Sequence, residues 1–317
     1  MRRDSGQGDV TVPEPIRGST VLVTGGAGFV GSHLAAALAD ACTVRVVDDL
    51  SAGDRASVPS GVTFVEGDLR ETSVVVPAVD GVDYVFHQAG LVSVPESVER
   101  PIESHERNVD ATLAVLEAAR EQDARVVVAS SAAVYGSPSS VPIDETEPAA
   151  PTSPYGVDKL AADQYTRLYH DRYGVETVAL RYFNVYGPGQ RSGVVNAFLE
   201  RVRAGEPLTV EGDGEQTRDF VHVDDVVRAN LAAATTDAVG RAYNVGTGQQ
   251  TRIDDLAALI REIVGADVEI RHLDARPGDI ERSCADISRA RELLGFSPAV
   301  TLEAGLTELL EPGPVRQ

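Results

Sequence analysis

Cysteine, methionine, tryptophan and lysine are all scarce in this 317-residue sequence. Its two cysteines, Cys42 and Cys284, are too few for a disulfide framework or a cysteine metal site, which predicts a chain from a reducing cytoplasm. No apolar run approaches the roughly 18–20 residues of a membrane-spanning helix, so a membrane-spanning protein is excluded. Residues 1–17 are polar and lack the apolar stretch of a signal peptide, so we expect a flexible tail there.

Positive charge is the second shortage. The chain has 28 Lys+Arg against 49 Asp+Glu, a formal net charge of −21 at pH 7. Such a field repels phosphate backbones and argues against nucleic acid as a partner. Lys159 is the only lysine; an acidic surface with so little lysine is typical of halophilic proteins, although GC-rich coding explains it equally well. Under either explanation, a lysine kept at one position is expected to do something that arginine cannot.

Metal-ligand patterns are also missing. The six histidines show neither H-x-x-x-H nor mixed His/Cys spacing, so no metal site is predicted. They are His33, His87, His105, His170, His222 and His272.

Short β-rich runs alternate with helical patterns in the first part of the chain, which predicts an α/β fold with a doubly wound, Rossmann-like parallel sheet. The expected strands cover residues 19–24, 43–47, 62–65, 82–86, 125–129 and 176–181, and the clearest helical patterns cover 29–39, 102–120 and 155–172. After residue 181 the elements become short and glycine-rich. We therefore expect a Rossmann domain over 18–181, with a returning segment around 218–246, and a smaller substrate lobe within 182–317.

A glycine-rich turn follows the first strand. Thr24–Gly31 reads G-x-x-G-x-x-G: Gly25 permits the tight turn, Gly28 lets the backbone approach a diphosphate, and Gly31 allows close helix packing. Asp48 ends the next strand, where a carboxylate can bind the adenosine ribose. Because Asp49 rather than a basic residue follows, the cofactor is predicted to be NAD rather than NADP; Arg45, inside the strand, is expected to face elsewhere.

The second constellation is Tyr155 and Lys159, four residues apart and therefore on one face of a helix. An ammonium beside a phenol is expected to lower the phenol pKa from about 10 towards neutrality, which makes a general base. Ser131, after the fifth strand, is expected to bring its hydroxyl to the same place. Together these three residues are the predicted catalytic set.

These motifs resemble the extended short-chain dehydrogenase/reductase family, and most closely its NDP-sugar 4-epimerases. The resemblance runs from about Val21 to about Leu309. It is carried by Thr24–Gly31, Gly67-Asp68-Leu69, Ser130–Gly136, Tyr155/Lys159, Arg181–Gly187 and Arg218–Asp225.

The resemblance implies a set of binding roles. Phe29 and Val30 would cover the NAD diphosphate, Asp48 and Asp49 would meet the ribose, and Asp68 and Leu69 would bracket the adenine. Gln88 and Ala89 would line the nicotinamide half, Asn108 would lie near the cofactor, and Tyr155 and Lys159 would also contact it. The implied contacts to a UDP-sugar are Ser93, Ser131, Asn184, Val195, Thr209, Arg218, Arg276, Asp279 and Ser283. A homodimer paired through the helices over 102–120 and 155–172 is also implied.

The family runs several reactions, and two alanines favour one of them. Dehydratases and UDP-glucuronate decarboxylases carry an acidic residue just before the Val-Tyr-Gly segment, whereas this chain has Ala132 and Ala133 there. Alanine cannot transfer a proton, so epimerisation at C4 is favoured over elimination. A uronate epimerase, a decarboxylase, a dehydratase and a net dehydrogenase or reductase remain alternatives, as does a non-catalytic dinucleotide sensor.

Two positions depart from the 4-epimerases of plain hexoses. Val92 stands where some of them carry a lysine. Ser283 stands where members restricted to plain hexoses tend to carry a tyrosine facing the sugar C2 substituent. The smaller serine leaves room for an acetamido group, so N-acetylated UDP-sugars are expected as substrates too.

Overall fold

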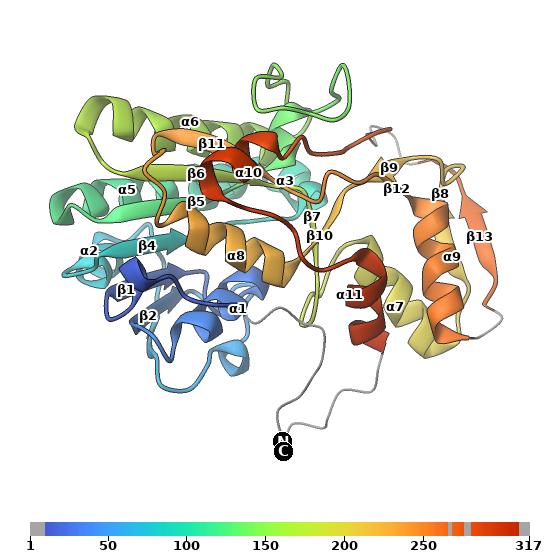
Figure 1. Cartoon of the computed structure of the whole chain (residues 1–317), viewed down its shortest axis with the longest axis horizontal. Coiled ribbons are helices and arrows are strands. Elements are labelled where there is room, and N and C mark those ends of the chain that lie inside the picture. The colour runs from blue at the N-terminus through green and yellow to red at the C-terminus, as the bar shows by residue number, and fades with distance from the viewer. Residues whose placement is uncertain (1–9, 266–267, 276–279, 311–317) are drawn as a thin grey trace.

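A seven-stranded parallel sheet forms the centre of the molecule, as a computed structural model describes it for residues 10–265, 268–275 and 280–310 (Figure 1). The strand order is β11-β6-β5-β4-β1-β2-β3, and every pairing in this sheet is parallel. The strands are β1 Thr20–Thr24, β2 Thr43–Asp48, β3 Thr63–Glu66, β4 Tyr84–His87, β5 Arg125–Ser131, β6 Thr177–Tyr182 and β11 Arg241–Val245. The predicted Rossmann-like fold class is confirmed. The edge strand β11 lies within the segment 218–246.

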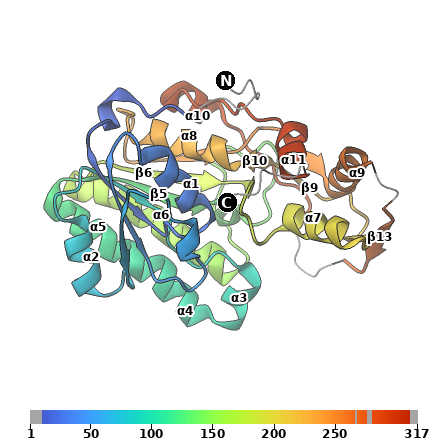
Figure 2. The same ribbon diagram turned by 90° about the horizontal axis from the view of Figure 1, so that it is seen from below.

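Helices cover both faces of this sheet (Figure 2). One face carries α2 (Thr72–Val79), α5 (Ala111–Gln122) and α6 (Pro154–Tyr173), and the other carries α1 (Phe29–Leu38), α8 (Val223–Ala233) and α10 (Ser288–Leu294). Each face has its own apolar core, because the strand side chains point alternately to either side. In the described part of the chain, no helix is both long and apolar enough to cross a membrane.

A second, smaller lobe lies beyond the carboxyl ends of the strands (Figure 1). It contains α7 (Val194–Ala204), β8 (Leu208–Glu211), α9 (Ile253–Val264), β13 (Ile270–Leu273) and α11 (Leu302–Leu310), which pack around a separate apolar cluster. Two further two-stranded ladders come from the same part of the chain: β7 (Asn184–Tyr186) with β10 (Phe220–His222), and β9 (Thr217–Arg218) with β12 (Thr251–Arg252). Ligands of open α/β sheets bind at this carboxyl edge.

The helical region predicted over 102–120 is divided. It consists of α4 (Pro101–His105), a π-helical turn (Glu106–Asp110) and α5, and the short helix α3 (Val94–Glu99) precedes it. A π turn inserts one residue into the helical ladder and often marks a functional position. Here it contains Asn108, one of the predicted cofactor residues.

Candidate active site

The glycine turn between β1 and α1 is sterically closed to any side chain. Gly25 has a φ of +65°, and a Cβ on it would lie 2.6 Å from the backbone nitrogen of Ala89. A Cβ on Gly31 would lie 2.2 Å from the carbonyl oxygen of Gly25. The turn therefore holds α1 directly against the ends of β1 and β4, as the G-x-x-G-x-x-G spacing predicts.

The N-terminus of α1 is open to an anion. Its N-cap is Gly28, which has no side chain to accept from the first-turn amides, and Phe29 and Val30 form that first turn. Unsatisfied amides and the partial positive charge of the helix end suit a diphosphate. This site would hold the diphosphate of a dinucleotide.

Asp48 lies beside this turn. Its carboxylate accepts from the backbone amides of Ala27 (2.9 Å) and Leu50 (2.8 Å), and burial raises its pKa. Each oxygen retains a lone pair that a ribose hydroxyl can use. Asp49 instead accepts from Arg107 at 2.9 Å. Arg45 points away, as expected, and donates to the carbonyl oxygen of Pro77 at 3.0 Å.

The predicted adenine-bracketing residues follow β3. Leu69 is buried, and Asp68 forms a bidentate pair with Arg70, whose hydrogen bonds lower the pKa of the Asp68 carboxyl. Arg70 also reaches Glu106 at 2.6 Å, beside the π turn. The charge of Arg70 is thus matched by two carboxylates.

A buried hydrogen-bond chain, which the sequence did not suggest, runs through His87. The amide of Ala89 donates to Thr24 Oγ1 (3.3 Å), which lies 2.8 Å from His87 Nδ1. His87 Nε2 lies 3.0 Å from Thr112 Oγ1, which itself donates to the carbonyl of Asn108 at 2.6 Å. Because the Thr112 hydroxyl uses its proton in the bond to Asn108, it can only accept from His87. His87 therefore carries its proton on Nε2.

His87 is neutral as well as buried. Burial, with the charge of Lys159 as a smaller cause, lowers its pKa to about 3. The chain therefore ties the glycine turn to the π turn without adding a charge.

Asn108 provides a buried acceptor with no partner. Its amide nitrogen donates to the carbonyl of Leu91 at 3.1 Å, but its Oδ1 has no hydrogen-bond partner among the described residues. A Cβ on Gly90 would lie 2.5 Å from this oxygen and 3.4 Å from Lys159 Nζ. The absence of a side chain at Gly90 therefore leaves both groups accessible to a ligand at the same place. A buried acceptor left unpaired is costly unless a ligand satisfies it. The ribose hydroxyls of a dinucleotide are suitable donors.

The predicted catalytic set comes together at the ends of β5 and α6. Tyr155 and Lys159 are 9% and 5% exposed, and Lys159 Nζ lies 6.0 Å from the centroid of the Tyr155 ring and donates to the carbonyl of Ala129 at 2.9 Å. Ser131 Oγ accepts from the amide of Ala133 at 3.1 Å, which leaves its hydroxyl proton free to donate. The interaction with this hydroxyl lowers the pKa of the Tyr155 phenol.

The expected direction of the Tyr155 pKa is wrong for the chain alone. Burial raises the pKa of Tyr155, and this effect exceeds the lowering by Ser131. Lys159, whose Nζ lies 6.0 Å from the centroid of the ring, does not reverse it, and burial lowers the pKa of Lys159 itself to about 8. Desolvation disfavours both charged forms, and sequence spacing carries no information about depth of burial.

The cofactor half contains Gln88 and Ala89 at the end of β4. Gln88 donates to Asn230 at 3.0 Å and accepts from the Tyr182 hydroxyl at 3.1 Å. The backbone of Ala89 lies against Gly25, as described above. Both residues therefore stand at the carboxyl edge of the sheet, where they are predicted to line the nicotinamide half.

The predicted substrate residues are more widely spread. Asn184 is exposed at the start of β7, and Arg218 in β9 donates to the carbonyl of Ile280 at 2.6 Å. The amide of Ser283 donates to the carbonyl of Thr217 at 3.1 Å, so Ser283 lies beside the Arg218 strand. Ser93 caps α3, Val195 is buried in the core of the smaller lobe, and Thr209 lies in β8. Arg276 and Asp279 fall outside the described residues.

Within the described residues no cluster of three His, Cys, Asp or Glu side chains could hold a metal ion. The arrangement instead offers an anion site at a helix end, a carboxylate for a ribose, an open buried acceptor, and a Ser/Tyr/Lys set. These features fit NAD and a secondary alcohol.

Known proteins share this fold and its motifs. Residues 21–246 match the model of the NAD dependent epimerase/dehydratase family. A UDP-glucose 4-epimerase of Mycolicibacterium smegmatis is 38% identical over 303 residues, which cover 92% of this chain and 97% of that protein.

Solved structures agree. A UDP-N-acetylglucosamine 4-epimerase from Methanobrevibacter ruminantium, in complex with UDP-N-acetylmuramic acid, matches with a TM-score of 0.89 and 36% identity over 92% of this chain and 97% of that one. A UDP-glucose 4-epimerase from Thermus thermophilus, in complex with NAD, matches with a TM-score of 0.84 and 38% identity over 91% and 96%. The chain therefore belongs to the NAD-dependent epimerase/dehydratase family, and NAD is its cofactor.

Proposed function

We propose that this protein is an NAD-dependent UDP-sugar 4-epimerase that interconverts UDP-glucose and UDP-galactose, and also their N-acetylated forms. The observation that carries the proposal is the intact Ser131, Tyr155 and Lys159 set, next to a turn that has no carboxylate. Ala132 and Ala133 begin the 3-10 turn Ala132–Tyr135, where an elimination reaction would need an acid–base group. The dehydratase, decarboxylase and net dehydrogenase alternatives are not favoured.

The chemistry assigned to the chain is proton transfer and orientation. Bound NAD supplies the hydride acceptor and donor. Tyr155, the proposed general base, takes the proton of the sugar C4 hydroxyl and later returns it. Ser131 donates a hydrogen bond to the same oxygen and stabilises it as it becomes a keto oxygen. Lys159 places a positive charge near both groups, and Arg218 is a candidate anchor for the sugar diphosphate.

The test is the product formed from UDP-glucose. The purified enzyme is expected to yield UDP-galactose, resolved by anion-exchange chromatography, without net accumulation of NADH. Steady NADH accumulation would identify a dehydrogenase, and an unsaturated or decarboxylated sugar would identify one of the other reactions.

Ser283 is expected to control acceptance of N-acetylated sugars. Replacing Ser283 with tyrosine should lower kcat/KM for UDP-N-acetylglucosamine by about tenfold or more and leave kcat/KM for UDP-glucose close to wild type, because the ring fills space at the C2 substituent. The matched control is Ser283→Ala, which removes the hydroxyl and adds no volume. A wild-type enzyme that ignores N-acetylated sugars, or a tyrosine variant that affects both pairs equally, would contradict this assignment.

We further propose a homodimer formed through α3, α4 and α6. Large apolar side chains are exposed on these helices: Val94, Val98, Ile102, Val157, Tyr165 and Leu168. The stripe on α6 faces away from the sheet, since the buried side of α6 carries Tyr155, Asp158, Lys159 and Asp163. On a chain with a net charge of −21, an exposed apolar patch of this kind is suited to pairing with the same patch on a second copy of the chain. Free thiols at Cys42 and Cys284 are consistent with the proposed cytoplasmic location.

The dimer is tested by introducing charge. Ile102→Asp together with Val98→Asp is expected to convert the dimer into a monomer by light scattering, because two carboxylates would be buried at the interface. The control is Val76→Asp, which charges a residue that is 51% exposed on α2, away from this face. A wild-type protein that is monomeric refutes the proposal.

A further inference from the structure

Four arginines surround one hollow, away from the catalytic set, in a chain whose net charge is −21. The hollow measures about 210 Å³, and its lining includes Arg167, Arg181, Arg241, Arg289 and Glu145. A water molecule in the liquid occupies about 30 Å³, so the hollow has room for a polyatomic ion. It lies where α6, the edge strand β11 and α10 meet.

The carboxylates at this hollow do not balance its arginines. Asp163 is fully buried and accepts from Arg181 at 2.9 and 3.1 Å and from Arg167 at 3.0 Å. Glu145, also buried, lies 3.4 Å from Arg289. Two buried carboxylates thus pair with three of the four guanidinium groups, and Asp144, near Arg289, is exposed to solvent. Arg241 forms no ion pair with any described residue.

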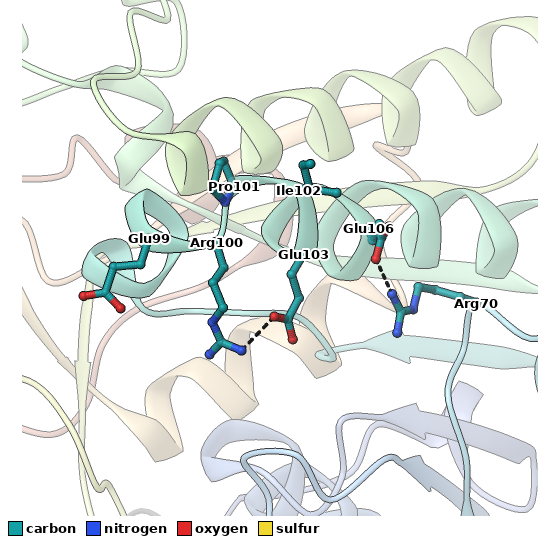
Figure 3. Close-up of a pocket in the computed structure, with 7 residues that line it drawn as sticks. All are labelled: Arg70, Glu99, Arg100, Pro101, Ile102, Glu103 and Glu106. Atoms are coloured by element: carbon teal, nitrogen blue, oxygen red, sulfur yellow. Dashed lines mark hydrogen bonds and ion pairs between the residues drawn. The ribbon is translucent and has the colours of Figure 1, made fainter.

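A second hollow, on α3 and α4, shows what a balanced arrangement looks like (Figure 3). Its two arginines are each paired with two carboxylates: Arg70 with Asp68 and Glu106, and Arg100 with Glu96 and Glu103. Glu99 adds another carboxylate to the lining. An anion has no reason to enter there, so the excess of arginine at the first hollow is not a general property of this surface.

We propose that the hollow formed by Arg167, Arg181, Arg241 and Arg289 binds a small oxyanion of the phosphate class. Guanidinium groups donate pairs of parallel N–H bonds to such anions, and Arg181 is held rigidly by Asp163 at the base of the hollow. The bound anion would connect α6 to β11 and α10, which are far apart in the sequence. It would therefore stabilise the folded state in proportion to its occupancy.

Hydrogen bonds connect the lining of this hollow to the segment that carries Ser131. Arg181 donates to the Tyr135 hydroxyl at 2.9 Å, and Tyr135 ends the turn that begins directly after Ser131. Ser130 donates to Asp163 at 3.2 Å. Arg181 is thus connected to β5 in two ways. Tyr135 lies in the turn that follows β5, and Asp163 accepts a hydrogen bond from Ser130 near its end. The proposal concerns binding at this hollow and does not depend on the proposed reaction.

Inorganic phosphate is the probe, titrated calorimetrically into the enzyme saturated with NAD and UDP at constant ionic strength. Saturation occupies the phosphate-binding groups of the active site, so one further phosphate site per chain is expected. Arg241→Gln, which breaks no ion pair in the described structure, and the double variant Arg241→Gln/Arg289→Gln should weaken this binding, the double variant by about tenfold or more. Epimerase activity without phosphate should remain unchanged in both.

The matched control removes the same charge elsewhere. Arg201→Gln/Arg271→Gln neutralises two surface arginines that pair with Glu206 and Glu269. This variant should bind phosphate as the wild type does. The proposal is overturned if the saturated wild type binds no phosphate, if the double variant at the hollow binds it unchanged, or if the control loses binding to the same extent.

Discussion

Replacing Tyr155 with phenylalanine is expected to lower kcat by about 10²–10⁴-fold while NAD remains bound. The variant removes one oxygen, the proposed proton acceptor, and keeps the ring that packs near Lys159. Nothing on the adenosine side changes, because the glycine turn and Asp48 lie on β1, α1 and β2. The loss should therefore appear in the chemical step and not in cofactor affinity.

The measurement pairs single-turnover epimerisation with NAD binding followed by calorimetry. Tyr165→Phe is the control, since it removes a phenol oxygen from the exposed side of the same helix. Near-normal turnover in Tyr155→Phe would show that another group takes the proton. Equal losses in both variants would show that the effect is structural.

The sheet could be predicted wherever strand signals are local. Strands β1 to β6 are short apolar runs that end in turns or in polar residues, so their positions follow from composition over four to seven residues. The remaining strand of the sheet, β11, reads Arg-Ala-Tyr-Asn-Val and has a polar residue at two of its five positions. It joins the sheet at an edge, next to β6, after a long insertion. Such a strand is defined by its partner rather than by its own sequence.

The same division applies to the site. The glycine turn and the Tyr155/Lys159 pair are set by spacing within a few residues, so the sequence is sufficient. The partners of His87 are 63 and 25 residues away in the chain, and Asp163 meets Arg181 across two elements. No periodicity can predict such pairs.

Helix α6 shows why the apolar pattern alone misleads. Its polar residues face inward, where Ser104 donates to Asp158 at 2.6 Å and Arg181 donates to Asp163 at 2.9 Å. A buried polar side chain is tolerated when its hydrogen bonds are satisfied. Whether the buried polar groups find hydrogen-bond partners depends on other elements. The apolar stripe of α6 alone therefore does not reveal which face of the helix is buried.

Removing the charge of Lys159 is expected to stabilise the NAD-free protein and abolish its activity. Burial lowers the pKa of Lys159 from 10.5 to about 8. At pH 7 the lysine is charged in both the folded and the unfolded state, and burying that charge costs about 3 kcal/mol. Lys159→Met removes this cost but also loses the hydrogen bond to Ala129, worth about 1 kcal/mol. The free energy of unfolding should rise by about 2 kcal/mol.

The stability gained by Lys159→Met is expected to depend on pH. Between about pH 8 and 10.5 the folded wild type has released its proton while the unfolded chain still holds one, so wild-type stability increases with pH. The advantage of Lys159→Met should therefore be complete below pH 8 and shrink as the pH rises towards 10.5. Urea unfolding of the NAD-free proteins at pH 7 and at about pH 9.5 measures it. A methionine variant that is less stable at pH 7, or whose advantage does not change with pH, would contradict the argument.

Lys159→Arg keeps the positive charge at this position and changes the size and shape of the group that carries it. The guanidinium stays charged throughout this range, and it is larger and planar at a position where Lys159 is only 5% exposed. Both turnover and stability should fall in this variant, whereas the methionine variant should lose turnover and gain stability. This chain has arginine at all its other Lys/Arg positions and would then be keeping one buried ammonium at a cost in stability, which is expected only where that compact charge serves the reaction.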